Sequence, residues 1–231
     1  MCIRDRLLQY WPTLLVGQYP NGPLGGLVLT LILAALGLAM SMPLALLIAL
    51  ARVSPFGWLR VASKALVNVV RGMPLLMLIF WAYFVVPKLT GQVVSGFWTL
   101  IFALVVYESA YLSEVIRSGI EAVPRGQIEA SRSLGVGYWT TMRKVVLPQA
   151  LFNVLPSMTS QFVSTIKETS LGYVISVNEL TFAANQVNNL VLTQPLQVFG
   201  ILAIIYFLVC FSLSRGLSWL DLRIRRSRAM A

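Results

Sequence analysis

The chain has 231 residues, of which 58% are hydrophobic and 11% are charged, and its mean hydropathy is +0.78. A soluble domain carries about 25% charged residues, so this composition excludes an ordinary globular core and predicts a membrane protein. The net charge of +10 does not indicate nucleic-acid binding, because Lys and Arg lie in short segments between apolar runs, where they set membrane topology. The chain lacks histidine, and Cys2 and Cys210 have no metal-site spacing, so we expect no metal and no cofactor.

Apolar runs in the chain are long enough to cross a bilayer as helices. The predicted spans are residues 24–50, 61–86, 97–116, 151–177 and 196–213. We therefore expect an all-α integral membrane fold with about five transmembrane helices in a domain of residues 24–214. Residues 1–23 are predicted to be an N-terminal periplasmic segment, and residues 215–231 are predicted to be a basic cytoplasmic tail. The first six residues are interpreted as a candidate artefact.

The distribution of positive charges predicts the orientation in the membrane. Lys and Arg are frequent after the first, third and fifth spans, whereas the other connections contain only Lys88. The positive-inside rule then places the N-terminus outside and the C-terminus in the cytoplasm of a bacterial inner membrane. Residues 178–195 should lie outside, either as a docking surface or as a solvated connector.

The cytoplasmic stretch of residues 119–150 is much longer than a helix–helix connection requires. Pro124 and Gly126 mark the start of a short helix, and Gly135 and Gly137 mark its end. The pattern predicts a lever that a cytoplasmic partner can grip. The alternative is an ordinary amphipathic helix at the membrane surface.

This stretch contains Glu129-Ala130-Ser131, then Gly135, Val145 and Leu147-Pro148 at fixed spacing, and it resembles the EAA loop of ABC importer permeases. Ser131 replaces the second alanine and Val145 replaces isoleucine. The segments at Arg71–Leu76, Tyr107–Tyr111 and Lys167–Leu171 resemble the polar amino-acid branch (histidine, glutamine and glutamate/aspartate type). The run Phe80–Pro87 is similar to the glutamate/aspartate permease subunits.

The resemblance implies a MetI-like, type I importer permease with a cytoplasmic EAA coupling helix. It also implies four kinds of partner: a dimer of ATP-binding subunits, a second permease subunit in a homo- or heterodimer, a periplasmic amino-acid-binding protein, and membrane lipid. The chain has no Gly-x-x-x-x-Gly-Lys-Ser/Thr loop, so we expect that it is not an enzyme and that a separate subunit hydrolyses ATP. The expected coupling residues are Gly126, Gln127, Glu129, Ala130, Ser131, Leu134 and Gly135.

Ionisable residues inside the spans are functional candidates, because a charge in hydrocarbon is costly. The substrate-pathway candidates are Arg71, Glu108, Lys167, Glu168, Thr169 and Ser170. Glu108 either meets a substrate ammonium group or bonds a neighbouring helix. Lys167 either faces the pathway, where it would suit an acidic substrate, or snorkels to water beside Glu168. Arg71 precedes a helix interruption that lines a cavity or is a packing kink.

Three other functions are the alternatives for a membrane protein of this kind. A secondary transporter should have more spans, repeated halves and a coupling-ion site, and a channel or scaffold does not account for the cytoplasmic lever. An ABC permease for another small solute is disfavoured only by the resemblance at Arg71–Leu76.

Overall fold

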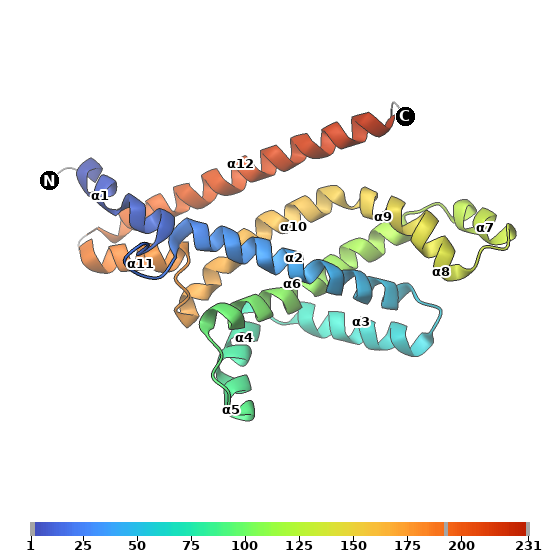
Figure 1. Ribbon diagram of the computed structural model, residues 1–231, viewed down its shortest axis with the longest axis horizontal. Coiled ribbons are helices and arrows are strands. Elements are labelled where there is room, and N and C mark those ends of the chain that lie inside the picture. The colour runs from blue at the N-terminus through green and yellow to red at the C-terminus, as the bar shows by residue number, and fades with distance from the viewer. Residues whose placement is uncertain (1–2, 192–193, 230–231) are drawn as a thin grey trace. The chain divides into compact units, whose positions relative to one another are not determined.

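The computed structural model describes residues 3–191 and 194–229, and its regular elements are helices throughout this part of the chain (Figure 1). The predicted all-α class is confirmed. Parts of the predicted N-terminal segment (residues 1–2), outer connection (192–193) and basic tail (230–231) lie outside the described residues. The helices in chain order are α1 (Ile3–Val16), α2 (Gly26–Val53), α3 (Gly57–Gly72), α4 (Leu75–Phe80), η1 (Trp81–Val85), α5 (Val86–Thr90), α6 (Gly96–Glu121), α7 (Arg125–Ser133), α8 (Tyr138–Thr141), η2 (Met142–Val146), α9 (Leu147–Asn153), α10 (Leu155–Glu168), η3 (Thr169–Ile175), α11 (Leu180–Val191) and α12 (Pro195–Ala229).

Three of the described helices, α2, α6 and α12, are long and apolar enough to cross a membrane by themselves. The pair α3 and α4–α5 passes the same test only when taken together, as a broken span or a re-entrant loop. The interruption falls at Pro74, which has φ −62° and ψ 138°, because proline lacks an N–H donor and disfavours the helical conformation of the residue before it. The predicted second span is therefore broken where its Gly-Met-Pro sequence indicated.

The predicted span of residues 151–177 is not one continuous helix. It is divided into α9, α10 and the 3₁₀ segment η3, and none of these meets the length for a span. Polar side chains throughout this stretch, together with Pro148 and Pro156, reduce both its hydropathy and its helical continuity. The number of five spans stays a prediction.

The two π-helical segments, η1 and η2, both lie directly before a proline-containing turn. η1 ends at Val85, two residues before Pro87, and η2 ends at Val146, two residues before Pro148. A proline inside a helix removes one hydrogen bond and clashes with the carbonyl of the preceding turn. A wider π turn just before it, closed by hydrogen bonds such as Leu147 N–H to the Met142 carbonyl, accommodates the ring without ending the helix.

The last helix is longer than predicted. The predicted span ends at residue 213, whereas α12 continues from Pro195 through Ala229 and includes most of the basic tail. The predicted division between membrane domain and tail near residue 214 stays a prediction. Gly216, within this stretch, does not stop the helix on its own.

The chain forms two compact units: unit 1 contains residues 1–39, 73–105 and 162–215, and unit 2 contains residues 40–72, 106–161 and 216–231. The core of unit 1 includes Leu14 from α1, residues of α11 such as Ala184, and residues of α12 such as Leu202. The core of unit 2 includes Ile48, Val67, Val70 and Ala110.

The predicted outer connection, residues 178–195, is not simply a solvated connector. It contains α11, which contacts α1 (Figure 1) and buries Leu180, Ala183, Ala184 and Val187. Gly25 and Gly26, at the start of α2, allow the backbone there to approach the Asn178 carbonyl before α11 closely. A Cβ on Gly25 would lie 2.5 Å from the Asn178 carbonyl oxygen, and Gly26 has φ +61°. The Gly26 N–H donates to that same carbonyl at 2.8 Å, so this joint requires glycine.

Candidate functional site

The short helix predicted in the EAA-like stretch is α7, and its end is defined by Gly135. Gly135 has φ +77°. Its N–H donates to the Arg132 carbonyl at 2.9 Å, and the Val136 N–H donates to the Ser131 carbonyl at 3.3 Å. This pair of hydrogen bonds is a Schellman motif, for which glycine is the favoured residue. The sequence therefore located this terminus correctly.

Most of the predicted coupling residues lie on the solvent-exposed surface of α7 and of the turn that follows it. Leu134 is 83% exposed. Ser131 differs, because its side chain is buried and its Oγ lies 2.9 Å from Thr141 Oγ1 on α8. The exposed members of the set are Gly126, Gln127, Glu129, Ala130, Leu134 and Gly135.

The contacts that hold α7 in place come from its neighbours in unit 2. Besides the Ser131–Thr141 bond, Gln149 on α9 donates from Nε2 to Gln127 Oε1 at 2.6 Å. The Tyr138 hydroxyl of α8 donates to the Val53 carbonyl at the end of α2, at 2.8 Å. These bonds join the corner formed by α7 and α8 to α9 and to the end of α2, and sequence analysis did not find them.

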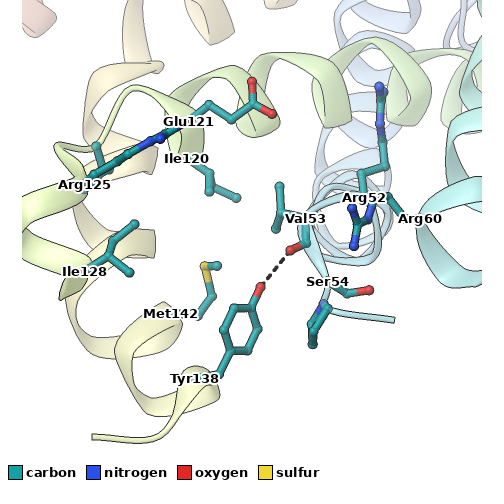
Figure 2. A pocket seen from close by; sticks show the side chains of 12 residues that line it. Arg52, Val53, Ser54, Arg60, Ile120, Glu121, Arg125, Ile128, Tyr138 and Met142 are labelled. Carbon is teal, nitrogen blue, oxygen red and sulfur yellow. Dashed lines mark hydrogen bonds between the residues drawn. The ribbon is translucent and has the colours of Figure 1, made fainter. Parts of the chain in front are cut away.

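A cavity of about 610 Å³ lies on the inner side of this corner (Figure 2). Figure 2 shows the side chains around it, with Arg125 and Ile128 of α7 on one side and Arg52 and Arg60 on the other. Its lining residues are Arg52, Val53, Ser54, Pro55, Arg60, Ile120, Glu121, Val123, Arg125, Ile128, Tyr138 and Met142.

Glu114 on α6 is the centre of an ion-pair network within unit 2. It pairs with Arg52 at the end of α2, with Arg71 at the end of α3 (3.6 Å) and with Arg117 one turn further along α6 (3.0 Å from Nε). Arg117 also pairs with Glu121. The i,i+3 spacing of Glu114 and Arg117 on one helix favours their pair, whereas Arg52 and Arg71 come from other helices and had no such local signal.

Two of the pathway candidates, Arg71 and Glu108, belong to unit 2. The Arg71 guanidinium pairs with Glu114 and also lies 5.1 Å from the centre of the Tyr111 ring, a cation–π distance. Glu108 is fully buried and accepts a hydrogen bond from Gln161 Nε2 at 2.8 Å. These contacts favour structural roles for both residues, and their place in a substrate pathway stays a prediction.

The other four candidates are consecutive at the junction of α10 and η3 in unit 1. Lys167 is exposed, whereas its neighbour Glu168 is partly covered, so the two side chains have different surroundings as expected. Thr169 is fully buried and donates to the Ile166 carbonyl at 2.7 Å. The Ser170 hydroxyl donates to the Lys167 carbonyl at 2.6 Å. Lys167 is therefore the most accessible side chain of this group.

Glu179, which sequence analysis did not single out, is a fully buried carboxylate that caps α11. It accepts hydrogen bonds from the backbone N–H groups of Thr181 and Phe182, both at 2.8 Å, and from the Tyr206 hydroxyl at 3.2 Å. A Glu directly before a helix was the available signal. Burial raises the pKa of Glu179 from about 4.5 to about 7, against the lowering effect of these bonds. Glu179 lies outside the candidate spans.

The elevated pKa of Glu179 predicts that stability depends on pH. Because the folded state binds the proton more tightly than the unfolded chain, stability should fall as pH rises from about 4.5 to about 7, by up to roughly 3 kcal/mol. We expect the apparent melting temperature of the purified protein to be higher at pH 5 than at pH 8, and Glu179→Gln to remove most of this difference. The exposed control Glu129→Gln should retain it. An unchanged pH dependence in Glu179→Gln would contradict the prediction.

The fold and this surface define a multi-pass membrane protein with an exposed helical corner, and comparisons with known proteins identify its family. Residues 41–226 match the family described as "Binding-protein-dependent transport system inner membrane component". The chain belongs to this family, whose members are the membrane permeases of ABC transporters.

Several curated relatives are similar over most of this chain. An Escherichia coli K12 protein described as "Inner membrane amino-acid ABC transporter permease protein YhdY" is 35% identical over 208 residues, which cover 88% of this chain and 57% of the relative. The "Probable glutamine ABC transporter permease protein GlnP" of Bacillus subtilis is 36% identical over 200 residues, which cover 86% and 91%. The "Glutamate/aspartate import permease protein GltK" of Escherichia coli O6:H1 is 32% identical over 207 residues, which cover 87% and 92%.

The solved structures agree with the family assignment. The "Crystal structure of an amino acid ABC transporter with histidines" contains a chain with a TM-score of 0.84 and 30% identity, covering 96% of this chain and 99% of that one. A chain of the MetNI methionine ABC transporter has a TM-score of 0.64 at 21% identity, over 94% and 98%, which supports the fold alone. The predicted MetI-like permease fold is confirmed.

Proposed function

We propose that this chain is the membrane-spanning permease subunit of an ATP-driven ABC importer that carries a polar amino acid across the bacterial inner membrane. The observation that carries the proposal is the exposed surface of α7, where Glu129, Ala130 and Gly135 have the spacing of the EAA loop. The relatives described as amino-acid ABC permeases support the class of solute.

The proposed coupling is mechanical. A dimer of ATP-binding subunits grips α7 from the cytoplasm, with the N-terminus of the permease outside and its C-terminus inside. The Ser131–Thr141 and Gln127–Gln149 bonds then pass the movement of α7 to α8 and α9. A second permease subunit completes the pore, and a periplasmic binding protein delivers the amino acid.

Reconstitution provides the test of this proposal. The chain, its partner permease, the ATP-binding subunit and the binding protein should together transport a labelled amino acid into proteoliposomes only when ATP is supplied on the α7 side. Uptake driven by an ion gradient without ATP would instead support a secondary transporter. Uptake of a non-amino-acid solute alone would support an ABC permease for another small solute.

Within this function we propose glutamate or aspartate as the substrate. Lys167 supports the choice, because an exposed lysine in a pathway favours an acidic solute through a charge-assisted hydrogen bond. The relative named for glutamate and aspartate import points the same way, whereas the relatives named for glutamine, cystine and arginine define the alternatives.

Lys167→Ala tests this assignment. If Lys167 contacts the side-chain carboxylate of the substrate, the KM for glutamate uptake should rise by roughly tenfold, as expected for the loss of a charge-assisted bond, while glutamine uptake changes little. Lys88→Ala, which removes an exposed lysine from α5 in the same unit, is the matched control and should leave both substrates unaffected. An unchanged KM for glutamate would remove Lys167 from the pathway.

A further inference from the structure

We infer that the cavity behind α7 binds the headgroup of an anionic phospholipid, a role that goes beyond the proposed transport function. The first argument is its charge. Three arginines and one glutamate line it, but Arg52 pairs with Glu114 and Glu121 pairs with Arg117. Arg60 and Arg125 remain, and neither forms an ion pair with a residue whose side chain the structure describes. The cavity thus carries two unneutralised guanidinium groups, which favour an anion.

The second argument is the level of the cavity relative to the membrane. Arg52 and Val53 form the last turn of α2, and Ile120 and Glu121 end α6. Both helices are candidate spans, so their ends lie where a hydrocarbon core meets its headgroups. Basic pockets between helices at this level hold anionic headgroups.

The third argument is the chemistry of the remaining lining. Ile120, Val123, Ile128 and Met142 provide an apolar wall beside the arginines, which suits a molecule with a charged head and an apolar body. Next to the lining residues in sequence, Phe56 is 51% exposed and Trp58 is 71% exposed. Exposed aromatic side chains at span ends are typical of the membrane interface.

An acidic side chain of a partner protein is the competing occupant, and the geometry of α7 disfavours it. Arg125 and Ile128 are three residues apart, so they share one face of the helix, and this face lines the cavity. The exposed positions proposed for the partner, such as Glu129 and Ala130, do not line the cavity, although Glu129 lies one turn after Arg125 on the helix. A partner that grips those positions does not need to enter the cavity.

Native mass spectrometry of the full chain, titrated with phosphatidylglycerol or with zwitterionic phosphatidylcholine, tests the inference. We expect one bound phosphatidylglycerol with a clear preference over phosphatidylcholine. The variant Arg60→Gln/Arg125→Gln should weaken phosphatidylglycerol binding by roughly fivefold per arginine, with phosphatidylcholine unaffected. The matched control Arg143→Gln/Lys144→Gln removes two exposed charges of the same unit outside the cavity, and should change binding by less than about twofold.

Equal loss of phosphatidylglycerol in the pocket and control variants would overturn the inference in favour of general surface attraction. Unchanged lipid binding in the pocket variant would also overturn the inference. This holds whether the variant still copurifies with an ATP-binding subunit or fails to do so. Two further variants decide the question if the glutamine variant does not fold. Arg60→Lys/Arg125→Lys keeps the charge and should keep most of the binding, and Ile128→Glu places a negative charge in the cavity lining and should lose it with all arginines present.

Discussion

Glu129→Lys is expected to abolish ATP-driven uptake while the protein still inserts and folds. Glu129 is exposed in the middle of α7, so the change removes no contact that the fold requires. At the proposed interface, however, it reverses a charge at the centre of the gripped surface, where a mismatched charge costs several kcal/mol. We expect uptake in proteoliposomes to fall by at least about a hundredfold, with loss of the ATP-binding subunit on copurification.

Thr140→Lys is the matched control for this variant. It introduces the same charge at an exposed position of the neighbouring α8, outside the set that resembles the EAA loop, and uptake should stay within about twofold of the unmodified protein. Normal uptake and copurification by Glu129→Lys would show that α7 is not the coupling element. Loss of uptake in both variants would instead indicate a general effect of positive charge on this surface.

Glu114→Gln should destabilise unit 2 more than Glu121→Gln, which neutralises the second acidic residue described in the ion-pair network. Glu114 pairs with Arg52, Arg71 and Arg117, which come from α2, α3 and α6. Glutamine keeps the size but removes the charge, and the three guanidinium groups are then left to repel one another. Hydrogen bonds to charged groups contribute about 1.5–3 kcal/mol each, and partial exposure of the site to solvent reduces this.

We expect the apparent melting temperature of Glu114→Gln in detergent to fall by several degrees, on the order of 2 kcal/mol of stability. The control is Glu121→Gln, whose side chain is 57% exposed and which, among the residues whose side chains are described, forms an ion pair with Arg117 alone; its effect should be less than about 1 kcal/mol. The difference between the variants should shrink in high salt, since exposed charges are screened. Equal melting temperatures for the two variants would contradict the view that Glu114 links three helices.

The places where the backbone breaks could be predicted from the sequence. Pro74 interrupts the second span, and Gly135 ends α7, because the missing N–H of proline and the left-handed conformation of glycine act locally, whatever the rest of the chain does. The length of α12 was underestimated for a related reason. The apolar run ends near residue 213, but helix propensity alone carries the helix on, since no strong breaker follows.

The roles of individual polar side chains were harder to predict. Ser131 matched a family position but faces Thr141, and Arg71 was grouped with the pathway candidates but pairs with Glu114. Glu179 gave only a weak capping signal, although it is buried among Thr181, Phe182 and Tyr206. Thr141, Glu114 and Tyr206 each come from a different helix than the residue they contact, and the sequence pattern did not show which helices become neighbours.

The sequence by itself therefore determined the membrane class, the breaks in the helices and the position of α7, because hydropathy and backbone sterics are properties of consecutive residues. Only the tertiary structure decided which face of α7 is exposed, which arginines surround Glu114 and that a cavity lined by Arg60 and Arg125 lies behind the corner. Packing brings together residues that are far apart in the chain, and charge, burial and hydrogen bonding act over those spatial distances.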